Sequence, residues 1–151
     1  MSEPTIYDKI IEGSVPNYKV WEDDNYLAFL TPFGNTIGFT VVIPKNNPGD
    51  NYIDVADKAY LGLMEAAKKV AALLRKAFNV YRVGLVIEGE GVPHLHVKLI
   101  PMHGLSKEGG THRRAGPVFY DQYQGYLTTV EGPQMSPERL KEIQEQIKAA
   151  A

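Results

Sequence analysis

The chain has 151 residues, a length that suits one domain built around a single hydrophobic core. Sixteen basic and eighteen acidic residues leave a formal net charge of −2, so no global field attracts nucleic acid or an anionic membrane. The absence of cysteine excludes disulfides, thiolate nucleophiles and cysteine zinc sites, and suits a reducing compartment. Neither a signal peptide nor a membrane-spanning apolar run is present, so we expect a cytoplasmic protein with no membrane or nucleic acid partner.

The opening segment predicts a short helix over residues 5–11. Thr5 and Asp8 have the spacing of a capping box, in which each side chain binds a backbone N–H of the first turn. Gly13 follows as a helix stop, because glycine adopts the left-handed conformation that ends many helices.

The next segments predict three strands and a long helix. Apolar runs over residues 18–21 and 26–30 flank a polar turn and predict a β-hairpin. Residues 37–43 are rich in β-branched side chains and predict a third strand, which ends before Pro44. Residues 55–78 carry apolar side chains at alternating steps of four and three, as expected for one face of a helix.

The second half of the chain predicts two more strands, over residues 82–88 and 94–101. Residues 104–135 show little periodicity, although 125–130 suit a short strand. A closing helix is expected to begin around residues 136–138, a serine cap followed by proline and glutamate. Strands joined by tight turns favour an antiparallel sheet, so the fold class is α+β.

The most informative motif lies in the strand predicted over residues 94–101. Side chains alternate along a strand, so His94, His96 and Lys98 are expected on one face, with apolar residues between them on the other. Three titratable groups in a row are costly to bury without partners. We therefore expect them to line an open, solvent-filled cleft.

Three kinds of chemistry suit this row of side chains. A histidine can attack phosphorus as a nucleophile, with the neighbouring cation stabilising the phosphoryl oxygens. Alternatively, His94 and His96 can ligate a metal together with His103 or Glu88, although the charge of Lys98 opposes a divalent cation. In the third case the cluster binds an anion and catalyses nothing.

The motif and its surroundings resemble the histidine triad (HIT) family. The run Pro93–Lys98 resembles its triad motif, in which histidines alternate with apolar residues. Residues 7–13, 15–30 and 38–45 are similar to the family's opening helix, first hairpin and following strand. The resemblance covers residues 5–103 of a single domain spanning 1–151, with 104–151 as an irregular C-terminal extension that ends in a helix.

The resemblance implies a fold, an activity and an assembly. The implied fold is a five-stranded antiparallel sheet with one long helix and shorter flanking helices, usually in a homodimer. The implied activity is hydrolysis or transfer at the α-phosphate of a dinucleoside polyphosphate or nucleoside phosphoramidate. In it the middle histidine, His96, forms a covalent nucleotidyl intermediate and His94 organises the site. Neither a cofactor nor a catalytic metal is implied. Neutral His96 is required, so we expect turnover to fall below about pH 6.5 if its pKa is unperturbed.

The sequence departs from the family pattern at several positions that would contact the ligand. Lys98 replaces the third histidine and contacts phosphate as a point charge. Thr31 stands where an aspartate usually holds the ribose hydroxyls, and Ile87 and Glu88 lie where an asparagine usually contacts phosphate. The turn before the motif is short and ends in Glu90 and Gly91.

These departures leave two functions open: a nucleotide hydrolase or transferase, and a HIT-fold nucleotide- or phosphate-binding protein with little or no catalysis. The expected substrate-binding residues are His94, Lys98, Thr31, Gly91, Glu90 and His103. Tyr7 and Asp8 lie where zinc-binding members carry cysteine, so the structural zinc of those members is not expected. The basic run over 111–114 suits either plain surface or contact with a phosphate-bearing leaving group.

Overall fold

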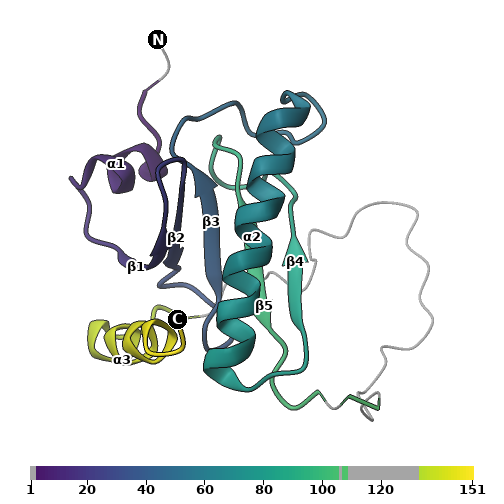
Figure 1. The fold of residues 1–151 in the computed structure, drawn as a ribbon. Helices are drawn as coiled ribbons and strands as arrows, with labels where there is room; N and C mark the ends of the chain where they lie inside the picture. The colour runs from purple at the N-terminus through teal and green to yellow at the C-terminus, as the bar shows by residue number, and fades with distance from the viewer. Residues whose placement is uncertain (1–2, 106, 109–132) are drawn as a thin grey trace, which may run out of the picture.

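A computed structural model describes residues 3–105, 107–108 and 133–151. Five antiparallel strands form one sheet in the order β1-β2-β3-β5-β4, as predicted for an α+β fold (Figure 1). The helices are α1 (Ile6–Glu12), α2 (Asp57–Phe78) and α3 (Pro137–Lys148). The strands are β1 (Tyr18–Glu22), β2 (Tyr26–Leu30), β3 (Thr40–Pro44), β4 (Val83–Val86) and β5 (Val97–Pro101).

The predicted helix caps are present. The backbone N–H of Asp8 donates to Thr5 Oγ1 at 3.1 Å, and that of Thr5 donates to Asp8 Oδ2 at 2.7 Å, which completes a capping box. Gly13 ends α1 with φ of 80°. Ser136 caps the N-terminus of α3, where its Oγ accepts from the N–H of Arg139 at 3.2 Å.

Helices cover both faces of the sheet. The long helix α2 crosses one face (Figure 1), and α3 packs beside it on that face through Leu140, Ile143 and Ile147. The shorter α1 packs on the opposite face, where Ile10 contacts a second apolar cluster. The buried members of that second cluster from the strands and the segment before β3 are Leu27, Phe29, Phe39, Val41 and Ile43.

Two strands begin three residues later than the sequence indicates, and the strand expected over residues 82–88 spans only Val83–Val86. The strand expected from residue 37 begins at Thr40, because Gly38 adopts φ of 84° and turns the chain beneath the Phe78 ring. The strand expected from residue 94 begins at Val97. The N–H of Leu95 donates to the carbonyl of Gly49 at 2.6 Å, so the backbone here bonds to a loop rather than to a neighbouring strand.

Two further segments bear on the predictions. The strand expected over residues 125–130 and the basic run 111–114 lie outside the described residues. None of the helices in the part of the chain that the structure describes has the length and apolarity needed to cross a bilayer.

Candidate functional site

The predicted alternation holds across residues 94–99, although β5 itself begins only at Val97. His94 and His96 project onto the α1 face of the sheet, where the ring of Tyr7 contacts both imidazoles edge-on, with centroid distances of 5.7 and 5.4 Å. The intervening side chains enter the core beneath α2; they are Leu95, Val97 and Leu99. This one short segment therefore contributes side chains both to the hydrophobic core and to the candidate functional site.

The prediction that the two histidines line an open cleft is wrong, because both rings are buried. His94 is 0% exposed and His96 is 1% exposed. Burial is tolerated because backbone carbonyls accept from the rings. His94 Nε2 donates to the carbonyl of Pro44 at 2.8 Å, and His96 Nδ1 donates to the carbonyl of His94 at 2.7 Å. The packing of α1, with Tyr7 over both rings, closes this face.

The hydrogen bond of His96 determines its tautomer. A carbonyl oxygen only accepts, so Nδ1 carries the proton and Nε2 of the neutral ring holds a lone pair. Burial lowers the pKa of His96 below its ordinary value, and the nearby charge of Lys98 lowers it further, while the His94 carbonyl acts in the opposite direction. A neutral imidazole with a free lone pair is the form that can act as a nucleophile.

The carboxylate of Asp8 lies near His94 Nδ1, the ring nitrogen that does not bond to the Pro44 carbonyl. His94 Nδ1 lies 3.5 Å from Asp8 Oδ1 and makes no hydrogen bond in the structure. Hydrogen bonds from Thr5 lower the pKa of Asp8, and the field of His94 adds to them. The carboxylate that caps α1 thus also places a negative charge beside the histidine pair.

Lys98 is ion-paired rather than free to meet a phosphate. Its Nζ donates to Oε1 of Glu88, and both side chains are largely buried. The register of β4 with β5, which sets Val86 opposite Lys98, brings Glu88 within reach. Glu90, which is expected to bind substrate, is exposed.

The remaining predicted site residues, Thr31, Gly91 and His103, lie at different places around the sheet. Thr31 directly follows β2 and its Oγ1 accepts from the N–H of Phe33 at 3.3 Å. Gly91 adopts φ of 89° in the turn before the motif. His103 is exposed beyond the opposite end of β5, where its Nε2 donates to the carbonyl of Ile37 at 2.9 Å. The structure therefore does not bring His103 beside the two buried histidines.

Metal ligands do not converge here. In the described ranges, which omit residues 1–2, 106 and 109–132, no three His, Cys, Asp or Glu side chains are placed to hold one ion. Of the four candidate ligands of the metal hypothesis, His103 lies beyond the far end of β5, and Glu88 is bound to Lys98.

The HIT domain profile matches residues 12–105. The chain belongs to the HIT family. Protein hit of Bacillus subtilis (strain 168) is 33% identical over 108 residues, covering 68% of this chain and 74% of that protein. Adenylylsulfatase HINT1 of Arabidopsis thaliana is 31% identical over 105 residues, 64% of this chain and 70% of that protein. The structure of a Hit-like protein involved in cell-cycle regulation from Bartonella henselae has a TM-score of 0.73 at 25% identity and covers 100% of this chain and 99% of that one.

HIT proteins are nucleotide-binding proteins and generally nucleotide hydrolases or transferases. In this HIT protein, sequence reasoning missed the contacts that Tyr7, Asp8 and the Pro44 carbonyl make with the histidine pair. The one available signal was the resemblance given above, which sets Tyr7 and Asp8 where zinc-binding members are expected to carry cysteine. A backbone carbonyl leaves no signal in the sequence.

Proposed function

We propose that this HIT protein is a nucleotide hydrolase or nucleotidyl transferase that acts at an α-phosphate through a covalent intermediate on His96. One observation carries the proposal: the Nδ1–H of His96 donates to the carbonyl of His94, which leaves Nε2 as the lone-pair nitrogen. Its lowered pKa keeps the ring neutral at physiological pH. The substrate class is a dinucleoside polyphosphate or a nucleoside phosphoramidate.

The reaction has two displacement steps. His96 Nε2 donates its lone pair to the α-phosphorus, and the bond from phosphorus to the leaving group breaks with its electron pair going to that group. Water or another acceptor then attacks the same phosphorus and breaks the N–P bond. His94 positions His96 through its carbonyl. Lys98, Thr31, Gly91 and Glu90 remain the proposed substrate contacts, whereas His103, beyond the far end of β5, is left out of the proposed site.

Two structural features shape this mechanism. Because His96 is 1% exposed and the ring of Tyr7 packs edge-on against it, we expect neighbouring side chains to move before phosphorus reaches Nε2. Because Glu88 holds the ammonium of Lys98, the cation is offset by a carboxylate unless the bound phosphate draws it away. Both features predict a slow step that precedes chemistry.

Rapid-quench trapping tests the covalent step. Wild-type protein is mixed with substrate radiolabelled at the α-phosphate and quenched in alkali, which preserves an acid-labile phosphoramidate. We expect label on wild type and on His103→Ala, and none on His96→Ala. Full turnover by His96→Ala, or label located on another residue, would remove the proposal.

A binding protein without catalysis is the second candidate. It is favoured by the burial of His96, by the ion pair of Lys98 and by the single hydroxyl of Thr31 where a bidentate ribose contact would be needed. A nucleotide that raises the melting temperature without forming any covalent adduct would favour this candidate over the enzyme.

A homodimer in the cytoplasm is also part of the proposal. Light scattering coupled to size exclusion, at several protein concentrations, measures the assembly directly. A mass that stays at one chain across those concentrations would contradict the dimer.

A further inference from the structure

An ion pair lies next to His96 on the α1 face of the sheet. Lys98 Nζ donates to Oε1 of Glu88, and the two side chains are 20% and 14% exposed. Each side chain is therefore mostly shielded from solvent but retains a surface that a bound molecule can contact. The pair thus sets a proton donor and a proton acceptor in one hydrogen bond beside the candidate nucleophile.

The sheet explains why Glu88 lies on the same face as His96 and Lys98. Val86 pairs opposite Lys98, and side chains alternate along a strand. Ile87 packs into the larger core under α2, so its neighbour Glu88 projects toward the α1 face. The antiparallel register, continued by two residues, sets Glu88 opposite His96. Besides burial, which lowers the pKa of His96 most, the charge of Lys98 lowers it and that of Glu88 raises it, as expected for groups close to the ring.

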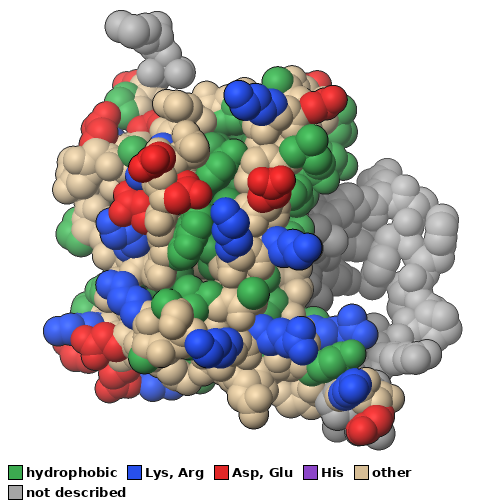
Figure 2. Space-filling view, viewed as in Figure 1, with side chains coloured by type: hydrophobic (Ala, Val, Ile, Leu, Met, Phe, Trp, Pro, Cys, Tyr) green, Lys and Arg blue, Asp and Glu red, His purple; other side chains and the backbone are tan. Residues whose placement is uncertain are grey.

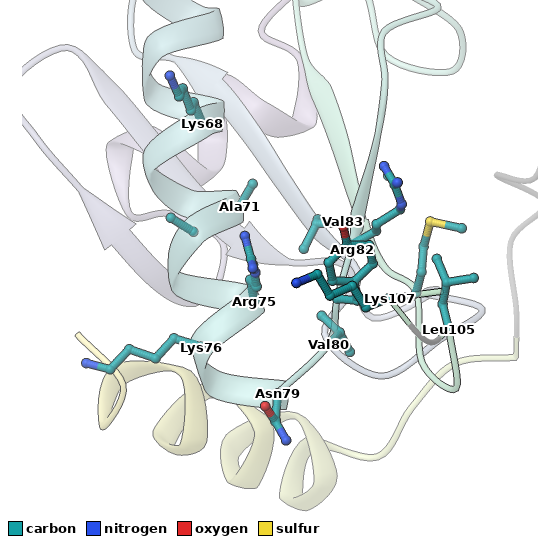
Figure 3. Close-up of a pocket in the computed structure, with 14 residues that line it drawn as sticks. Lys68, Ala71, Arg75, Lys76, Asn79, Val80, Arg82, Val83, Leu105 and Lys107 are labelled. Carbon is teal, nitrogen blue, oxygen red and sulfur yellow. The ribbon is translucent and has the colours of Figure 1, made fainter. Parts of the chain in front are cut away.

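Other cations of the described chain gather on the opposite side of the sheet. Figure 2 shows Lys and Arg side chains over the lower half of α2. Figure 3 shows Lys68 and Arg75 on α2, with Arg82 next to β4. This is the α2 face, since Val83 of β4 packs against that core, whereas His96 lies on the α1 face. The sheet therefore separates these cations from a group bonded to His96.

The proposed reaction requires two proton transfers that His96 cannot perform. In the first displacement a basic leaving group, such as an amine, departs far more readily once it is protonated. In the second, the attacking water must lose a proton. While Nε2 of His96 is bonded to phosphorus, its Nδ1–H is held by the carbonyl of His94, and His94 Nε2 donates to the carbonyl of Pro44. The proton donor and acceptor must therefore come from other side chains on this face.

We propose that Lys98 and Glu88 are the proton-transfer pair of this site, an inference that rests on the proposed function. As the bond from phosphorus to the leaving group breaks, Lys98 Nζ gives one proton to the departing atom and becomes a neutral amine. In the second step the carboxylate of Glu88 takes a proton from water, the water oxygen bonds to phosphorus, and the electron pair of the N–P bond returns to His96 Nε2. The proton then crosses the hydrogen bond from Glu88 to Lys98, which restores both groups with one water consumed.

A comparison of two leaving groups tests the role of Lys98 as an acid. Adenosine 5′-phosphoramidate releases ammonia, which leaves with a proton, whereas the p-nitrophenyl ester of AMP releases a stable phenolate that needs none. Both are radiolabelled at the α-phosphate. Lys98→Arg keeps the positive charge, but a guanidinium does not give up its proton. We expect this variant to label His96 at least about 100-fold more slowly than wild type with the phosphoramidate, and within about threefold of wild type with the ester.

The lifetime of the covalent intermediate tests the role of Glu88 as a base. Glu88→Gln keeps the size of the side chain and leaves no carboxylate to accept a proton. We expect the ester to label this variant, and water to release the label at least about 100-fold more slowly than from wild type. Hydroxylamine attacks through a neutral nitrogen and needs no base, so it should release the label from both proteins at rates within about threefold of each other.

The matched control is Arg139→Met, which removes an ion-paired cation from α3 on the other face. Its labelling and release rates should equal those of wild type, and circular dichroism checks that every variant is folded. Equal changes with both leaving groups in Lys98→Arg, or release by water at the wild-type rate in Glu88→Gln, would overturn the proton-transfer pair and leave the covalent mechanism standing. Absence of label on wild type from either substrate would remove the proposed function and this inference with it.

Discussion

His96 illustrates how neighbours set the state of one side chain. Burial lowers its pKa, so between the folded-state and unfolded-state values the unfolded chain binds more protons than the native protein. Stability from this group is therefore complete above the unfolded value of about 6.5 and falls as the pH drops from there toward the folded pKa. Because the pKa of His96 is lowered, we expect turnover to fall at a pH below about 6.5 rather than near it.

The charge of Lys98 gives a test of this pKa. Lys98→Met removes the nearby cation and leaves the Glu88 carboxylate without its partner. The loss of the cation and the remaining negative charge both favour the protonated imidazole of His96. We expect the pKa of His96 to rise in Lys98→Met and to change little in Lys98→Arg, which keeps the charge. An NMR titration of the imidazole protons measures it without requiring turnover. An unchanged or lower value in Lys98→Met would contradict the assignment.

The α1 helix is the element that links the sequence to the site. Seven residues are too few to be stable as an isolated helix, so its capping box and the burial of Ile10 hold it on the sheet. The same turn carries Tyr7 and Asp8 to the histidine pair. A change at the cap should therefore affect the site as well as stability.

Thr5→Ala removes the hydroxyl that caps α1. We expect the free energy of unfolding to fall by about 1 kcal/mol, because the N–H of Asp8 loses its acceptor. Urea denaturation measures the change, and Thr5→Ser, which keeps the oxygen, is the matched control. Equal losses in the serine and alanine variants would mean that the methyl group, not the cap, matters.

Elements were more predictable from sequence than their contacts. The caps of α1 and α3 and the stripe of α2 depend on local spacing, which a single sequence displays. The late start of β5 and the burial of His94 depend on carbonyls of Gly49 and Pro44, about fifty residues away. Every residue has such a carbonyl, so the sequence contains no mark of which one is used.

At the scale of the whole molecule, the larger hydrophobic core lies on one face of the sheet and the candidate site on the other. Leu95, Val97 and Leu99 pack into the larger core with α2 and α3, while the histidines between them face α1. The partner of Lys98 followed from the β4–β5 register, which is a property of the assembled sheet. Sequence reasoning placed Lys98 on one face with His94 and His96 and expected it to contact phosphate, but it did not anticipate the ion pair with Glu88.

The separation predicts different outcomes for core variants on the two faces. Ile143, 1% exposed, anchors α3 to the α2 face, and Ile143→Ala should lower the free energy of unfolding by about 2–5 kcal/mol. Where the variant remains folded, labelling of His96 by substrate should stay at the wild-type level. Thermal denaturation and the trapping assay measure the two effects, and a loss of labelling in the folded variant would contradict the separation.

The closed face above His96 has a consequence for chemical footprinting. An acylating reagent such as diethyl pyrocarbonate meets the exposed ring of His103 directly, whereas the ring of His96 is 1% exposed and has Tyr7 packed edge-on against it. We therefore expect His96 to be modified more slowly than His103, and mass spectrometry gives the ratio of the two rates. Tyr7→Ala should bring that ratio toward unity.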